Sequence, residues 1–331
     1  MLSKFKKSKM RNIITIILLL VVTKSICQEL NVPIFTQQLA DNPFVVSPTY
    51  AGIGDNVRIR VNGLSQWVGI KNAPQNQAVY ADMRIADRSG VGISLYNDKN
   101  GFTRQAGAKF SFAQHIILDY YSSQFLSFGL SYNYNNFRID TDEFNKTIFD
   151  PSITNNRFNA NNNFDLGFLY RNKSFFTSFN VANLLTKDIE NFRGIEPNLL
   201  RNYQVYSGYT FNTDLVEGLE IEPSVFYQYY QSDRRSTTDI NLKLRKKNLD
   251  DNYYWAGISA RFLNDQSLKP IMIGPMAGMK QKNFFFGYSY LITTNELSGF
   301  NSGTHILTLG LDIFQGLSNC PCTQYMTKDS Y

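Results

Sequence analysis

The chain has 331 residues, of which 18% are charged and 15% are aromatic, and its formal net charge is +6. Residues 1–27 hold six of the 33 basic residues and no acid, which leaves 27 basic and 27 acidic residues in the rest of the chain. Because the main part of the chain is electrically balanced, its charge gives no reason to expect nucleic acid as a partner.

The first segment predicts a cleaved signal peptide over residues 1–27. Positions 4–11 contain five basic residues, and the apolar stretch 13–22 is too short to cross a bilayer as a helix. Ser25-Ile26-Cys27 then places small residues where a signal peptidase cuts, before Gln28. Acylation of Cys27, as in a lipoprotein, fits the flanking residues less well. The chain is therefore expected to be exported.

Residues 28–56 are predicted to form an N-terminal arm. Asn42-Pro43 and Ser47-Pro48 force extended or turning backbone, so no regular strand is expected there. We expect this arm to lie in the periplasm, or to line or plug the lumen of the barrel that follows.

Residues 57–315 alternate apolar and polar side chains with a period of two, which predicts strands with one apolar face. Leu126, Phe128 and Leu130, for example, alternate with Ser and Gly. Small polar residues fill a protein core poorly, so the pattern favours a membrane barrel over a soluble β-sandwich. Tyrosines near the strand ends are typical of the aromatic girdles of such barrels. The aromatic residues in question are Tyr132, Tyr134, Tyr227, Tyr229, Tyr230, Tyr253, Tyr254, Trp255, Tyr288 and Tyr290.

We therefore predict an all-β fold, a single transmembrane antiparallel β-barrel of about fourteen strands. The expected strands are 57–66, 76–86, 90–97, 103–116, 122–137, 161–171, 174–183, 201–212, 219–231, 236–246, 252–262, 270–279, 282–293 and 304–315. The even-numbered connections are short and the odd-numbered ones include the longest, 138–160 and 184–200. Since bacterial barrels have short periplasmic turns and long outer loops, both termini are expected in the periplasm.

A charged stripe along the lumen would favour a channel or transporter. Arg58 and Arg60 hint at a charged lumen, but the other inward faces are read mostly as Gly, Ser and Asn. A basic cluster also stands near the end of one strand, at Lys243, Arg245, Lys246 and Lys247. It is either a solvated strand end or a contact for lipopolysaccharide or an acidic partner.

Residues 316–331 are expected to form a C-terminal tail that contains Cys320-Pro321-Cys322. In an exported chain these cysteines can be oxidised, bind a metal or cross-link to a partner. No His lies near them in sequence, so a zinc site with about four ligands is not expected.

Catalysis finds little support. His115 and His305 are the two histidines, and neither has metal-ligand spacing. The sequence contains no Gly-x-Ser-x-Gly elbow and no phosphate-binding loop. We expect no enzyme, cofactor or metal site, and the remaining enzymatic alternative is a hydrolase that pairs a wall serine with His305.

Several local motifs are more distinctive than the general pattern. In chain order they are Phe35-Thr36-Gln37-Gln38, Asn42-Pro43, Ser47-Pro48-Thr49-Tyr50-Ala51-Gly52, Ser65-Gln66-Trp67-Val68-Gly69-Ile70, Ala73-Pro74, Gly90-Val91-Gly92-Ile93-Ser94, Tyr96-Asn97-Asp98-Lys99, Gly101-Phe102-Thr103-Arg104-Gln105 and Ser298-Gly299-Phe300-Asn301-Ser302-Gly303-Thr304-His305. Together they resemble the PorP/SprF family of type IX secretion system outer-membrane proteins, found in Bacteroidota. Ile306 departs from the family pattern, which often has an acid there, and the tail runs on past the last strand.

The resemblance implies a non-enzymatic outer-membrane component of the type IX secretion and gliding machinery. Such a component anchors a secreted surface protein or adhesin, or aids its export, through the C-terminal domain of that protein. Other secretion components in the outer membrane and periplasm are implied as partners, beside the bilayer and lipopolysaccharide. The alternative is a passive channel or transporter for a small solute.

The exported partner is expected on the outer loops 66–75, 138–160, 184–200 and 294–303. The candidate partner-binding residues are Trp67, Val68, Ile70, Pro74, Asn97, Asp98, Phe300 and His305. Trp67 is either an interfacial anchor or a binding hot spot. Asn97-Asp98-Lys99-Asn100-Gly101 is expected to form a tight hairpin loop.

Overall fold

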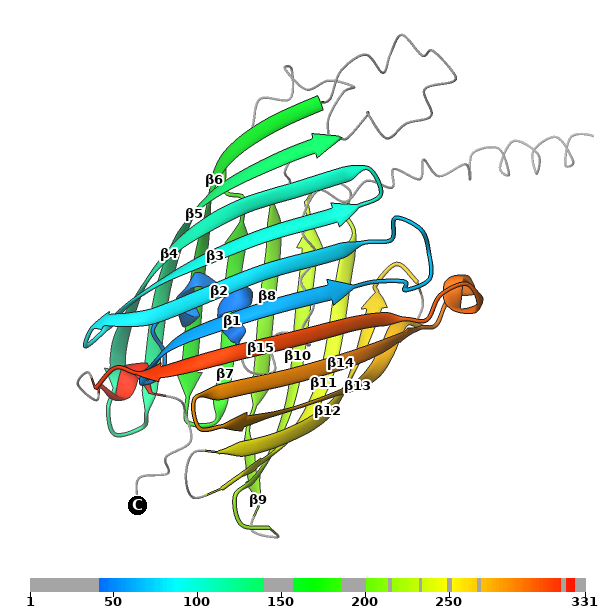
Figure 1. Ribbon diagram of the computed structural model, residues 1–331. Helices are drawn as coiled ribbons and strands as arrows, with labels where there is room; N and C mark the ends of the chain where they lie inside the picture. The colour runs from blue at the N-terminus through cyan, green and yellow to red at the C-terminus, as the bar shows by residue number, and fades with distance from the viewer. Residues whose placement is uncertain are drawn as a thin grey trace, which may run out of the picture.

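The chain folds as one closed antiparallel β-barrel in the computed structural model (Figure 1). The structure describes residues 42–139, 157–185, 201–213, 216–231, 234–248, 252–266, 269–316 and 320–324. The predicted all-β fold with fourteen strands around the barrel is confirmed.

The strands follow the predicted runs closely. They are β1 (Asn56–Ser65), β2 (Gln75–Ala86), β3 (Ser89–Asn100), β4 (Thr103–Asp119), β5 (Gln124–Ile139), β6 (Arg157–Asn172), β7 (Phe175–Ala182), β8 (Asn202–Tyr209), β9 (Phe211–Thr213), β10 (Leu219–Tyr230), β11 (Ser236–Lys247), β12 (Tyr253–Leu263), β13 (Pro270–Gln281), β14 (Phe284–Thr293) and β15 (Thr304–Phe314). One predicted strand is interrupted: β8 and β9 follow each other along the same neighbour, β10. They occupy one position around the barrel, which closes where β1 pairs with β15.

Each strand presents alternate side chains to the two faces of the wall. On β5, Leu130, Tyr132 and Tyr134 are exposed on the outside, whereas Ser127 and Ser131 are fully buried within. The same alternation places an apolar band around the barrel, as expected where lipid is the outer solvent. Among the described residues, no helix is long and apolar enough to cross a membrane.

Two ends of the barrel can be distinguished. β1 begins opposite the last residue of β15, with Asn56 paired to Phe314, so the barrel starts and finishes at one end. The tight β2–β3 and β13–β14 turns lie at this end, which we call the short-turn end (Figure 1). The connections 66–74 and 294–303 lie at the opposite end, which we call the long-loop end.

The predicted tight hairpin is present but shorter than 97–101: β3 runs to Asn100, which pairs with Thr103, and Gly101 with a φ of 62° makes the turn. The placement of some girdle aromatic residues is wrong. Three aromatic residues expected in the outer girdles lie on the inner face instead: Tyr230 and Trp255 are each 4% exposed, and Tyr253 packs against the cluster of Trp255. Trp255 stacks there on Phe285, with ring centroids 6.4 Å apart.

Candidate functional site

The interior of the barrel is occupied by the chain's own N-terminal segment. Two short 3-10 helices, η2 (Pro43–Val45) and η3 (Pro48–Tyr50), lie inside the wall (Figure 1). Each begins with a proline, whose fixed φ and missing N–H suit the first helical position. The Ser47 side chain accepts a hydrogen bond from the Thr49 N–H and caps the second turn. We call residues 42–55 the plug.

An apolar cluster anchors the plug to the inner wall. Phe44, Val46 and Tyr50 are each 5% exposed or less, and they belong to the same buried cluster as wall residues Leu169 and Phe226. Burial raises the pKa of Tyr50 well above its ordinary value, so this phenol remains neutral. The contact between the plug and the wall is therefore stabilised like a protein core, because the apolar side chains of both are removed from water.

Hydrogen bonds fix the position of the plug backbone. The Gly52 N–H donates to Asp82 Oδ2 at 2.9 Å, and Arg58 binds the same oxygen at 2.7 Å. His115 Nε2 lies 3.0 Å from the Ala51 carbonyl oxygen, so it donates there, while Nδ1 lies 2.8 Å from Ser127 Oγ. His115 is fully buried and is therefore a structural residue of the plug seat.

The wall has no side chain where the plug approaches most closely. A Cβ added at Gly90 would lie 2.1 Å from the Ala51 carbonyl oxygen, and one at Gly129 would lie 2.5 Å from the Thr49 nitrogen. No real Cβ atom tolerates such contacts, so both positions require glycine for the backbone approach.

The C-terminal tail closes over the base of the plug. η7 (Pro321–Thr323) lies beside it, and the Thr323 carbonyl accepts a hydrogen bond from the Gly54 N–H at 2.6 Å. Arg171, on the inner face of β6, donates to the carbonyl oxygens of Cys322 and Gln324. Cys320 and Cys322 form a disulfide with each other. The tail and the plug are thus held at the short-turn end as one assembly.

The interior also contains ion pairs, most of them buried, which the sequence interpretation of a mostly Gly, Ser and Asn interior did not anticipate. Arg261 makes two contacts with Asp239, at 2.7 and 2.8 Å. Arg60 binds Asp312 at 2.6 Å. The other pairs are Arg58–Asp82, Arg84–Asp55, Lys109–Asp165, Lys243–Glu222, Arg245–Glu220, Lys247–Glu220 and Lys280–Asp312.

The basic cluster of β11 is accordingly corrected. Lys243, Arg245 and Lys247 face the lumen, where Glu220 and Glu222 of β10 neutralise them. These three therefore face the lumen and are not an outward contact for lipopolysaccharide. Because side chains alternate along a strand, these three lie on one face of β11, whereas Lys246 lies on the other face. The sequence interpretation treated all four as one cluster.

The first loop, 66–74, is joined to its neighbours at the long-loop end. The Val68 N–H donates to the Gly303 carbonyl at 3.0 Å, and the Ser302 N–H donates back to Val68 at 2.7 Å. On the other side, the Gly101 N–H donates to the Asn72 carbonyl at 3.0 Å. These bonds combine loops 66–74 and 294–303 and the β3–β4 turn into one surface, which we call the loop rim.

Trp67 is held in this rim with a φ of 50°, a conformation rare for a bulky residue. Its indole nitrogen is buried and has no hydrogen-bond partner in the described part of the chain. The carbonyl of Trp67 accepts a hydrogen bond from the Ile70 N–H, and Pro74 is buried at the end of the loop. Phe300 is 76% exposed on the neighbouring loop.

The structure separates the other candidate residues. Asp98 faces inward and accepts a hydrogen bond from Asn76, whereas Asn97 lies on the outer face of β3. His305 lies on the outer wall, where Nδ1 is 2.6 Å from the Tyr288 hydroxyl and the ring is 5.0 Å from that of Tyr290. His305 thus belongs to an aromatic group of the wall rather than to a loop network. The predicted loops 138–160 and 184–200 fall largely outside the described residues.

Within the described residues, no group of three or more His, Cys, Asp or Glu side chains could hold a metal ion. A closed antiparallel barrel with an apolar outer band and a polar interior defines the class of outer-membrane β-barrel proteins.

The family follows from comparison with known proteins. The model of the family described as "Type IX secretion system membrane protein PorP/SprF" matches residues 27–311, so the chain belongs to the PorP/SprF family. It is accordingly an outer-membrane component of type IX secretion. No curated protein matches the chain.

Solved outer-membrane barrels are similar in fold. The CymD monoaromatic hydrocarbon channel superposes with a TM-score of 0.51 at 8% identity, covering 85% of this chain and 93% of the channel. Omp33 of Acinetobacter baumannii gives a TM-score of 0.44 at 11% identity, covering 79% of this chain and 100% of Omp33. At 8% identity, the similarity to the CymD channel shows the fold alone.

Proposed function

We propose that this protein works as a non-enzymatic anchor of the type IX secretion and gliding machinery. In this proposal, the loop rim faces the cell exterior and holds an exported surface protein by the C-terminal domain of that protein. The short-turn end, with the plug and the tail, faces the periplasm and contacts other secretion components. The signal peptide 1–27 is removed on export.

The occupied lumen is the observation that supports this proposal most. The plug is seated by an apolar cluster, by a hydrogen bond that Asp82 accepts and by one that His115 donates, and buried ion pairs line part of the remaining interior. A passive channel needs an open lumen. An interior filled in this way therefore favours a protein that binds partners at the two ends of the barrel.

The exposed side chain of Phe300 is the part of the rim best suited to bind a protein. An aromatic side chain that is 76% exposed on a loop held by backbone hydrogen bonds matches the usual chemistry of a binding hot spot. We expect Phe300→Asp to reduce retention of the exported protein at the cell surface. Tyr121→Asp is a matched control, because Tyr121 is 97% exposed at the opposite end.

The test follows the exported protein in cells. Deleting residues 140–158 is expected to release the cognate surface protein into the medium, and Phe300→Asp to release part of it. Unchanged surface display after the deletion would remove that loop from the proposal. Capture from native membranes followed by mass spectrometry should recover secretion components and a large surface protein.

Two further measurements test the orientation and the closed lumen. A cysteine introduced by Lys71→Cys should react on intact cells with a maleimide that cannot cross the membrane. The purified barrel should give no large, stable conductance in a planar bilayer. A large conductance would favour a channel instead, and a lipase activity abolished by His305→Ala would favour an enzyme.

A further inference from the structure

One glycine of the barrel wall is not explained by the packing around it. Gly63 lies inside β1, where it pairs regularly with Leu307 of β15 and Gln77 of β2, and its φ is not positive. At every other glycine within a described strand, an added Cβ would lie 3.2 Å or less from a neighbouring atom. At Gly63 an added Cβ would meet no atom within 4 Å. A glycine inside a strand, without a bulge or a close neighbour, marks a place where a ligand can approach the backbone.

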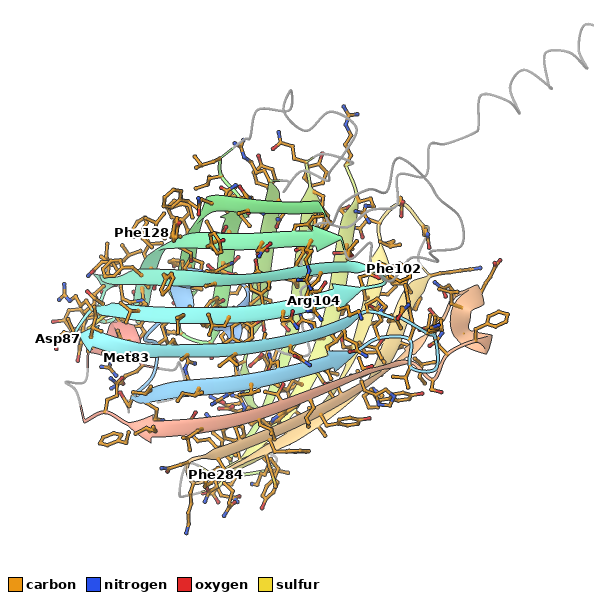
Figure 2. The ribbon with its side chains drawn as sticks, turned by 45° about the horizontal axis from the view of Figure 1, so that its top comes forward. Met83, Asp87, Phe102, Arg104, Phe128 and Phe284 are labelled. Carbon is orange, nitrogen blue, oxygen red and sulfur yellow. A yellow bond between two sulfur atoms is a disulfide. The ribbon has the colours of Figure 1, made fainter. Side chains whose placement is uncertain are left out.

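Gly63 forms part of a hollow in the outer wall. It points outward, because its neighbours in sequence, Asn62 and Leu64, are buried within the barrel. The hollow has a volume of about 520 Å³, which is within the range of small-molecule sites. Figure 2 shows this face of the barrel, with Met83 and Asp87 toward the short-turn end and Arg104 toward the long-loop end. The apolar side chains that line the hollow are Val61, Val79, Leu95, Leu307 and Leu309.

The register of β15, β1, β2 and β3 arranges the outward side chains of this face in three levels. The levels follow one another from the middle of the wall toward the long-loop end, over about 13 Å of strand. The first level is apolar, the second combines Gly63 with two amides, and the third carries a hydroxyl and an imidazole. The first consists of Val61, Val79, Leu95 and Leu309, the second of Leu307, Gly63, Gln77 and Asn97, and the third of Ser65 and His305.

The third level lies at the boundary between hydrocarbon and headgroups. Tyr290 is directly opposite His305, and Tyr288 donates to or accepts from His305 Nδ1 at 2.6 Å, so an aromatic group marks this height on the wall. The second level is therefore just inside the boundary, where the carbonyl groups that join acyl chains to a lipid are found. The side-chain amides of Gln77 and Asn97 offer N–H donors at this level, and a carbonyl oxygen accepts them.

We infer that this hollow binds one acyl chain of a membrane lipid together with the ester or amide carbonyl at the head of the chain. The chain lies over Gly63 and along Val61, Val79 and Leu95, and Gln77 and Asn97 donate hydrogen bonds to the carbonyl oxygen. Lipid tails are as apolar as leucine, so the fit of the chain in the hollow and the hydrogen bonds provide the preference for this place. A side chain at position 63 would occupy the space of the chain, which accounts for the glycine. The inference requires only that the barrel lies in the outer membrane, whichever end faces the exterior.

The test measures lipid that stays bound to the purified protein through detergent exchange, by native mass spectrometry. The probes are a phosphatidylethanolamine with two ester-linked chains and its ether-linked analogue, which has the same chains and headgroup but no carbonyl groups. The ether-linked lipid is expected to bind about fivefold more weakly, because it cannot accept the amide hydrogen bonds. Gln77→Leu/Asn97→Leu should bind both lipids equally. Gly63→Leu should bind the ester-linked lipid about tenfold or more weakly, since its side chain fills the hollow.

Ala256→Leu is the matched control for Gly63→Leu. Ala256 is exposed on the outer face of β12, away from the hollow, and the variant adds a similar apolar side chain to the wall. It is expected to retain lipid as the unaltered protein does. Equal weakening by the two leucine variants would overturn the site, as would equal binding of the ester- and ether-linked lipids by the unaltered protein.

A second comparison addresses the source of the acyl chain. A synthetic triacylated lipopeptide carries the same ester and amide carbonyls on a peptide. Tighter binding of this lipopeptide than of the phospholipid would overturn the assignment to a membrane lipid and favour the anchor of a lipoprotein. Because these measurements use no exported protein and no cell, their failure is distinct from failure of the anchoring function.

Discussion

The two sides of the lumen are filled in different ways. β3–β6 face the plug with Gly90, Gly129, Ser127 and His115, which are small or donate to its backbone. β10–β12 touch the plug through Phe226 and otherwise carry long charged side chains that pair across the wall, such as Arg261 with Asp239. Where the wall meets the backbone of the plug it needs room, whereas elsewhere its own side chains must fill the space. The interior chemistry of a barrel therefore indicates which strands a plug contacts.

Removing the plug tests this comparison most severely. Deletion of residues 42–53 should take away the apolar cluster around Phe44 and Tyr50 and leave an opening between β3–β6 and the ion-paired side. We expect a stable conductance in planar bilayers where the complete chain gives none, together with a lower unfolding temperature. Absence of conductance from the shortened barrel would mean that the ion pairs alone close the lumen.

Asp82→Ala should have the next largest effect, on stability. It removes the partner of buried Arg58 and the acceptor of the Gly52 N–H. Removing one member of a buried ion pair costs about 3–5 kcal/mol of unfolding free energy, because the remaining charge stays away from water. The midpoint of urea unfolding in lipid vesicles measures the loss.

Glu220→Gln is the matched change on the ion-paired side. Glu220 binds Arg245 and Lys247, whose side chains are 18% and 32% exposed, so water screens the charges that it leaves. A cost of about 1 kcal/mol is expected there. A cost as large as that of Asp82→Ala would contradict the distinction between the two sides.

His115→Ala should destabilise the plug seat less than Asp82→Ala does. The substitution leaves the Ala51 carbonyl and the Ser127 hydroxyl without their partner in a buried place, at a cost of about 1–3 kcal/mol. Protease cleavage within the plug at the short-turn end should become faster. If cleavage and unfolding are both unchanged, the plug is held by its apolar contacts alone.

A small effect is also expected from Cys320→Ser/Cys322→Ser. The disulfide closes a loop with one residue between its cysteines, so it constrains the unfolded chain little and contributes below about 2 kcal/mol. Comparing unfolding midpoints with and without a reductant on the unaltered protein gives the same quantity. A loss larger than that of Asp82→Ala would make the tail, rather than the plug seat, the main closure.

Much of the barrel could be predicted because period-two alternation is a local property. Leu126 to Tyr134 show the outward face of β5 without any knowledge of its neighbours, and the same holds for most other strands. The positions of the candidate partner-binding residues could be predicted less well from the sequence. Asn97 and Asp98 are adjacent in sequence but lie on opposite faces of the wall, and His305 joins Tyr288 only through the pairing of β14 with β15.

The side chains that face the lumen could not be predicted fully from the sequence either. Trp255 and Tyr230 looked like girdle residues, yet strand alternation turns both inward. Arg58 and Arg60 were recognised as charged, but their partners Asp82 and Asp312 come from β2 and β15. Nothing local connects residues that are 252 positions apart, as Arg60 and Asp312 are.

By itself the sequence determined the strands, their inner and outer faces and the family, because alternation and motifs are written along one stretch of chain. Only the tertiary structure decided what fills the barrel and what gathers on its wall. The plug seat and the ion pairs both depend on the register between strands, and register brings together residues that are far apart in the chain.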